Sequence, residues 1–248
     1  MLRTVFATRY VTPLREGGSL PAIVEADDLG LYVLKFRGAG QGPLALVAEL
    51  VAGEVGRVLG LQVPEIVFVE VDAELGRNEP DQEIRDLLQA SVGLNLALDY
   101  LPGSVMFDPA AGDRATSEVA SAAVWFDAFV TNIDRTARNP NLLYWHKTLH
   151  FIDHGAALYF HHNWPTADPR ARFAPIREHV LLPWAAAIGE ADLRLRPMLT
   201  PDVFATIMSN VPDAWLTASR EDYIRYFIER LESSAFVEEA MRAHADLV

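Results

Sequence analysis

The feature that most constrains the fold of this chain is a change in residue pattern near position 102. Before it, short runs of alternating or continuous apolar residues are separated by Gly, Pro and Asp, which is typical of strands and turns. After the break at 102–104, apolar residues recur at three- and four-residue spacing, most clearly in residues 220–245. The sequence therefore predicts a two-lobed α+β protein, with a β-rich N-lobe over residues 1–101 and a mainly helical C-lobe over residues 102–248.

The first part of the chain contains four predictable elements. Alternation predicts a hairpin over residues 22–36, with a turn where two aspartates and a glycine follow one another. A helix is predicted over residues 44–59, ended by a glycine, and strands are predicted at 65–71 and 92–101. The acidic, turn-rich segment 72–86 is interpreted as a solvated insertion in the N-lobe.

The second part contains one clear helix and one clear hairpin. The helix is predicted over residues 117–129, with Ser117 as its N-cap. A polar loop follows at 132–141. Two short strands are predicted at residues 142–145 and 149–152, and the rest of the chain is predicted to be mainly helical.

Composition excludes several classes of function for this chain of 248 residues. It has no cysteine, which rules out disulfides, thiolate metal sites and a cysteine nucleophile. Its net charge of −13 argues against a nucleic-acid partner, since binding phosphates needs clustered Lys and Arg. No apolar run approaches the ~20 residues of a membrane helix, and the first residues do not resemble a signal peptide. We therefore expect a cytoplasmic protein without a membrane partner; the residues do not indicate an oligomeric state.

The distribution of lysine points to a site. Of 21 basic residues only Lys35 and Lys147 are lysines, and Lys35 interrupts an apolar strand. Arginine cannot replace lysine where a compact charge is required. Glu49 has small or apolar neighbours at helical spacing, and a carboxylate on such a face is costly unless a cation meets it. We predict that Lys35 pairs with Glu49; the alternative is that Glu49 lies at an edge and stays solvated.

Two further segments carry the groups that ATP chemistry needs. Asp134 and Asn139 lie five residues apart in the polar loop, and Asp153 ends an apolar strand. In phosphoryl transfer one Asp orients the acceptor hydroxyl, an Asn and a second Asp hold Mg²⁺, and a Lys contacts the phosphates. Each residue alone is ordinary in loops. Their order and spacing together favour a phosphotransferase.

On these residues the chain resembles the HipA-like kinases, whose fold is akin to that of protein kinases and phosphoinositide kinases. The resemblance covers about residues 10–160. It is carried by Tyr32-Val33-Leu34-Lys35-Phe36, by Glu49 ahead of Gly60-Leu61-Gln62-Val63-Pro64, by Asp134 and Asn139, and by Asp153-His154-Gly155.

The resemblance implies a two-lobed protein-kinase-like fold with a role for each of these residues. Lys35 would hold the ATP phosphates and pair with Glu49, Asp134 would be the catalytic Asp, and Asn139 and Asp153 would bind Mg²⁺. The stretch Leu98-Asp99-Tyr100-Leu101 would be the hinge, so Asp99, Tyr100 and Leu101 would meet adenine through their backbone.

The chain also departs from the kinase pattern. In place of a G-x-G-x-x-G loop it offers only Gly17, Gly18 and Ser19, which we assign as the loop over the phosphates. His154 replaces the Phe of the protein-kinase Asp-Phe-Gly motif. The chain is short for the extra N-terminal domain of HipA toxins, so their protein substrate does not transfer directly.

The sequence thus predicts an ATP- and Mg²⁺-dependent kinase that passes the γ-phosphate to a hydroxyl acceptor. A Ser or Thr of a protein is the first choice of acceptor, and a small-molecule hydroxyl is the second. The thin glycine loop leaves open a nucleotide-binding pseudokinase that acts as an interaction module. A metal-dependent phosphoesterase ranks last, because the five histidines in 146–162 match no zinc-site spacing.

Overall fold

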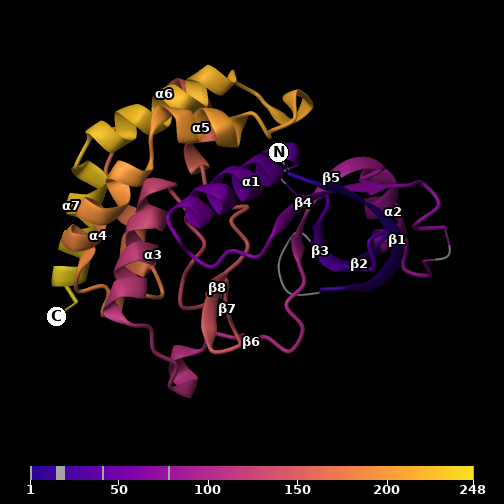
Figure 1. Cartoon of the computed structure of the whole chain (residues 1–248), viewed down its shortest axis with the longest axis horizontal. Helices are drawn as coiled ribbons and strands as arrows, with labels where there is room; N and C mark the ends of the chain where they lie inside the picture. The colour runs from indigo at the N-terminus through magenta and orange to yellow at the C-terminus, as the bar shows by residue number, and fades with distance from the viewer. Residues whose placement is uncertain (1, 15–19, 41, 78, 248) are drawn as a thin grey trace.

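The first part of the chain folds into a closed five-stranded barrel (Figure 1). The structure is a computed structural model, which describes residues 2–14, 20–40, 42–77 and 79–247. The strand order is β1-β2-β3-β5-β4, and the barrel closes because β1 pairs with β4 in parallel. The strands are β1 (Thr4–Pro13), β2 (Ala22–Ala26), β3 (Leu31–Lys35), β4 (Ile66–Val71) and β5 (Gly93–Asp99).

The apolar side chains of the barrel strands pack into two hydrophobic cores, one inside the barrel and one outside it. On β4, Val67 and Val69 point into the barrel, whereas Ile66 and Phe68 join the core outside it. This follows from the two-residue period of a strand, which sends successive side chains to opposite faces. The predicted hairpin is confirmed as β2 and β3, whose register pairs Val24 with Tyr32.

Helix α1 (Pro43–Val58) lies between the barrel and the helices of the second part, and this confirms the predicted helix to within one residue. It is buried along most of its length. Gly53 allows close packing, because a Cβ there would lie 2.5 Å from Cδ1 of Ile66 on β4. The helix ends where Gly60 takes a left-handed φ of 82°, a conformation that glycine adopts without steric cost.

Two elements of the barrel region differ from the prediction. Strand β1 was not predicted, because only Val5 among its residues is buried and no apolar alternation marks it. The solvated insertion at 72–86 is wrong for its second half, where helix α2 (Gln82–Ala90) begins. The Asp81 side chain caps α2, and Ile84 and Leu88 reach the barrel core. Two apolar positions in an acidic nine-residue helix give too weak a pattern to detect.

The second part of the chain is built on helix α3 (Ser117–Phe129), which confirms the predicted helix. Its N-cap is Thr116 and not Ser117, because the Thr116 hydroxyl accepts from the Val119 amide. The predicted strand pair is confirmed as β7 and β8, joined by β6 in a three-stranded sheet. These strands are β6 (Val105–Met106), β7 (Leu142–Trp145) and β8 (Thr148–Phe151).

The C-terminal third contains four α-helices in the described chain, with short 3₁₀ turns between them. They are α4 (Ile188–Leu195), α5 (Pro201–Met208), α6 (Arg220–Glu232) and α7 (Ala235–Ala245). The amphipathic stretch 220–245 is therefore two helices, separated at Ser233. The stretch 152–187 is not mainly helical as predicted, since it consists of loops and 3₁₀ turns. Among the described residues, no helix has the length and apolarity to cross a membrane.

Candidate active site

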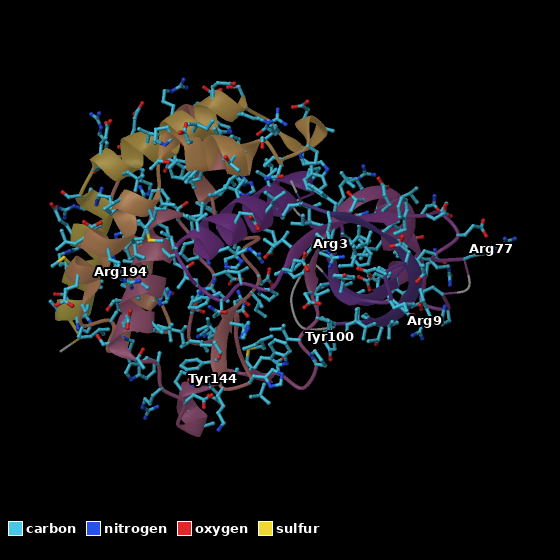
Figure 2. All side chains as sticks on the ribbon, viewed as in Figure 1. Arg3, Arg9, Arg77, Tyr100, Tyr144 and Arg194 are labelled. Carbon is cyan, nitrogen blue, oxygen red and sulfur yellow. The ribbon has the colours of Figure 1, made fainter. Side chains whose placement is uncertain are left out.

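A cleft of about 680 Å³ opens between the barrel and the β6–β7–β8 sheet. Figure 2 labels Tyr100 on the segment that leads from the barrel to this sheet, and Tyr144 on β7. The lining includes side chains from several segments that are far apart in the sequence. Among them are Val33 and Lys35, Leu98 to Leu101, Asn139 and Asn141, and Ile152 and Asp153.

Lys35 joins two carboxylates at the inner end of the cleft. Its Nζ lies 2.6 Å from Asp153 Oδ1 and 3.5 Å from Glu49 Oε2. Burial opposes the charged form of Lys35, but the charges of Glu49 and Asp153 outweigh it and raise the pKa of the ammonium. Glu49 is only 1% exposed, so the alternative of a solvated carboxylate is wrong.

The Glu49 carboxylate is also bound by His154. The backbone amide of His154 donates to both carboxylate oxygens, at 3.1 and 3.0 Å, and its ring Nδ1 lies 3.2 Å from Oε1. Burial disfavours the charge of Glu49, but Lys35 and these hydrogen bonds outweigh burial and lower its pKa. His154 therefore fixes Glu49 through both its backbone amide and its ring.

Asp134 does not line the cleft itself, but it is hydrogen-bonded to two residues that do. Its Oδ2 accepts hydrogen bonds from Asn139 Nδ2 at 2.8 Å and from Asn141 Nδ2 at 3.4 Å. Burial raises the pKa of Asp134, the charge of Asp153 adds to this, and the two amides oppose it. The sequence analysis did not predict Asn141 as a site residue. The only feature of the sequence that points to it is its position two residues after Asn139.

The arrangement fits a hard cation. Asn139 uses its amide nitrogen to hold Asp134, and Asp153 uses Oδ1 to hold Lys35. In the part of the chain that the structure describes, no group donates to Asn139 Oδ1 or Asp153 Oδ2. Amide and carboxylate oxygens are the ligands that Mg²⁺ prefers, alongside phosphate oxygens.

The other predicted site residues are placed as follows. Asp99, Tyr100 and Leu101 line the cleft. Their segment is hydrogen-bonded to the barrel. The backbone amide of Asp99 donates to the carbonyl of Glu65, and that of Tyr100 donates to the carbonyl of Leu31. The prediction for Gly17, Gly18 and Ser19 lies outside the described residues.

The histidines of residues 146–162 do not converge. His150 lies near the carbonyl of Thr148, His154 contacts Glu49, and His161 contacts the Tyr223 hydroxyl. Across the described ranges, no three His, Asp or Glu side chains form a group able to hold a metal ion. Nothing in these positions favours a phosphoesterase of the histidine-ligated type.

A model of the HipA-like kinase family matches residues 8–240. The chain belongs to the HipA-like kinase family. The match extends well beyond the 10–160 range on which the sequence motifs rest, so the C-terminal helices also belong to the family pattern. No curated protein matches the chain.

Solved kinase structures share the fold. The chain is similar to the Helicobacter pylori proinflammatory kinase CtkA, at 15% identity and a TM-score of 0.56, over 96% of this chain and 97% of that one. It is also similar to the Golgi casein kinase with Mn/ADP bound, at 10% identity and a TM-score of 0.54, over 98% and 73% of the two chains. A second Golgi casein kinase structure gives a TM-score of 0.51 at 10% identity, over 98% of this chain and 72% of that one. At these identities the likeness shows a kinase-like fold.

Proposed function

We propose that this protein is an ATP- and Mg²⁺-dependent kinase that transfers the γ-phosphate of ATP to a hydroxyl acceptor. The main support is the convergence of Lys35, Asn139 and Asp153 on one cleft, with Asp134 held by two of the residues that line it. These residues come from distant parts of the chain, and together they are the set that phosphoryl transfer requires.

In this proposal residues 1–101 and 102–248 are the two lobes, and ATP binds between them. The adenine lies among apolar side chains of both parts, Val33, Leu98, Leu143 and Ile152, beside the hinge backbone at 99–101. A cleft of about 680 Å³ has the size of a small-molecule site.

The charged end of the cleft receives the phosphates. Lys35 contacts phosphate oxygens, and Glu49 holds the ammonium in place for that contact. Asn139 Oδ1 and Asp153 Oδ2 are the protein ligands for Mg²⁺, which when bound neutralises charge on the phosphates. The Mn/ADP bound to the Golgi casein kinase supports a nucleotide and a divalent cation in this fold.

Asp134 orients the acceptor hydroxyl and accepts its proton. Its raised pKa makes the carboxylate a better proton acceptor than an exposed Asp. The protein therefore contributes positioning and charge, and no covalent intermediate is needed. Gly17, Gly18 and Ser19 stay assigned to the loop over the phosphates.

The acceptor is proposed to be a Ser or Thr hydroxyl of a protein, with a small-molecule hydroxyl as the second choice. The acidic composition supports a protein without a nucleic-acid partner. We place it in the cytoplasm, as the sequence predicts.

A thermal melt tests the nucleotide site. The protein is heated alone, with ATP and Mg²⁺, with ATP and EDTA, and with Mg²⁺ alone. Ligand at 100 times its Kd stabilises the fold by about 2.7 kcal/mol, which raises the midpoint by roughly 5–10 °C. A rise that needs both ATP and Mg²⁺, together with transfer of the γ-phosphate to a mixture of Ser- and Thr-containing peptides or to the protein itself, supports the kinase. A rise without any such transfer supports the pseudokinase, and no rise contradicts both.

A further inference from the structure

A buried carboxylate outside the cleft binds the loops that border it. Asp127 lies in the last turn of α3 and is fully buried. Its Oδ1 accepts a hydrogen bond from Asn132 Nδ2 at 2.8 Å. Its Oδ2 accepts from Arg135 Nε at 2.6 Å and from His179 Nε2 at 2.9 Å. The three donors come from two segments, so Asp127 joins the loop 132–141 to the segment around His179.

The charge balance of this cluster follows from its hydrogen bonds. The Leu181 amide donates to His179 Nδ1 at 3.0 Å, so Nδ1 carries no proton and Nε2 carries the one donated to Asp127. Burial lowers the pKa of His179, which keeps the ring neutral. Burial opposes the charge of Asp127, but Arg135 outweighs it and holds the Asp127 pKa well below its usual range. Asp127 and Arg135 are therefore one buried ion pair, oriented by His179.

The first connection to the cleft runs through Asn132. While its Nδ2 donates to Asp127, its Oδ1 accepts the backbone amide of Asp134 at 3.1 Å. The Asn132 amide also donates to the Asp127 carbonyl at 2.9 Å. One side chain thus fixes the backbone of Asp134 to the end of α3.

The second connection runs through Arg135. Its NH1 donates to the carbonyl of Asn141 and, at 3.3 Å, to the carbonyl of Ile152. The next residue, Asp153, has a left-handed φ of 54°, a conformation that is uncommon for residues with a Cβ and that surrounding contacts help to hold. Arg135 supplies part of that restraint, one residue before Asp153.

We infer that Asp127 is a positioning residue, which holds Asp134 and Asp153 at the cleft through Asn132 and Arg135. The inference rests on the proposed function for the roles of those two aspartates. Asp127 itself does not line the cleft. Loss of the Asn132 connection, which restrains Asp134 alone, should therefore lower turnover and leave ATP binding nearly unchanged.

The test removes the side chain that connects Asp127 to Asp134 and leaves the buried Asp127–Arg135 ion pair in place. In Asn132→Ala the Asp127–Arg135 pair remains, but Asp134 loses its backbone restraint. With Mg-ATP as the probe and no other acceptor present, water takes the γ-phosphate, and ADP and inorganic phosphate are the products measured. The kcat for this release should fall about 100-fold, since a misplacement of ~1 Å costs about that much. The KM for ATP should stay within about twofold. Amide hydrogen exchange, measured in the absence of ATP, should become faster in residues 132–141.

A second pair of variants tests the orientation of Asp127. His179→Leu removes the donor and should lower kcat. His179→Gln should restore kcat to within about twofold of the wild type, because its amide group both donates and accepts. The melting temperatures of the two variants are measured in parallel, and a kcat that follows the melting temperature alone would indicate a purely structural role.

The matched control is Ser121→Ala on the same helix. Ser121 is buried and its hydroxyl accepts from the Ala187 amide, away from the cleft. This variant should lose stability and keep the wild-type kcat and exchange of residues 132–141. Wild-type kcat and exchange in Asn132→Ala would overturn the inference. If ATP and Mg²⁺ neither raise the melting temperature of the wild type nor yield ADP, the proposed function fails, and hydrogen exchange alone decides whether Asp127 positions the loop.

Discussion

At the scale of single residues, the buried pair Lys35–Glu49 should contribute to stability. Glu49 is 1% exposed, and its charge is compensated by Lys35 and the amide of His154. Lys35→Met should lower the free energy of unfolding by about 3–5 kcal/mol, because it leaves a buried charge unpaired. Chemical denaturation measures the loss. The double variant Lys35→Met/Glu49→Leu should regain most of it, and a double variant as unstable as the single one would contradict the explanation.

Asp134 should matter for turnover and little for ATP binding. Asp134→Ala removes the group that orients the acceptor, so ADP release should fall about 10²–10⁴-fold. The ATP-dependent rise in melting temperature should persist, since Asp134 does not line the cleft. Glu190→Ala, at an exposed position on α4, is the control and should leave both readouts unchanged. Wild-type turnover in Asp134→Ala would rule out the assigned role.

The raised pKa of Asp134 predicts the pH dependence. The carboxylate form is needed, so kcat should fall as the pH drops through the raised pKa, at a midpoint above the ordinary 3.8. The same shift means that ionised Asp134 destabilises the fold at neutral pH, and that this cost disappears as the pH falls through the raised pKa. A kcat profile from pH 3 to 8 checks the first point. An acid limb at or below pH 3.8 would contradict it.

At the scale of elements, α2 should act as part of the barrel core. Leu88 and Ile84 are buried in that core, although the helix lies in an acidic segment. Leu88→Ala should cost about 2–5 kcal/mol, the usual range for emptying a buried leucine site. Gln89→Ala, on the exposed face of the same helix, should change the free energy of unfolding by less than about 0.5 kcal/mol. Equal effects in the two variants would mean that α2 does not pack as described.

At the scale of the whole molecule, one core joins the barrel to the helices. Buried residues of α1 pack with Ile66 and Phe68 of β4 and with the helices of the second part. The rings of Phe68 and Trp215 meet edge to face at 5.8 Å. A core shared in this way should make the two parts unfold together.

The positions of the tryptophans allow a direct check of this coupling. All five follow residue 102, at Trp125, Trp145, Trp164, Trp184 and Trp215. Leu88 packs in the barrel core, far in sequence from every tryptophan. Leu88→Ala should nevertheless lower the melting midpoint measured by Trp fluorescence, by about 2–4 °C for each kcal/mol of stability lost. The circular dichroism midpoint should fall equally. An unchanged fluorescence midpoint would show that the barrel and the helices unfold separately.

The local pattern of apolar and turn residues predicted the secondary structure correctly where a segment's own residues determine it. The hairpin of β2 and β3, the helices α1 and α3 and the strands β7 and β8 follow from apolar period and turn residues. The elements that were missed, β1 and α2, have few buried residues, and their partners lie far away in the sequence. Their stability comes from contacts that no local window contains.

The chain by itself determined its chemistry: a lone lysine in an apolar strand, a carboxylate on an apolar helix face, and Asp134, Asn139 and Asp153 in kinase order. Only the tertiary structure decided how these groups are held. Glu49 accepts hydrogen bonds from the amide of His154, and Asp127 accepts them from Arg135 and His179. These partners are brought together by the folded chain and not by local sequence. A buried charge must find its partners wherever packing brings them, and packing is a property of the folded chain.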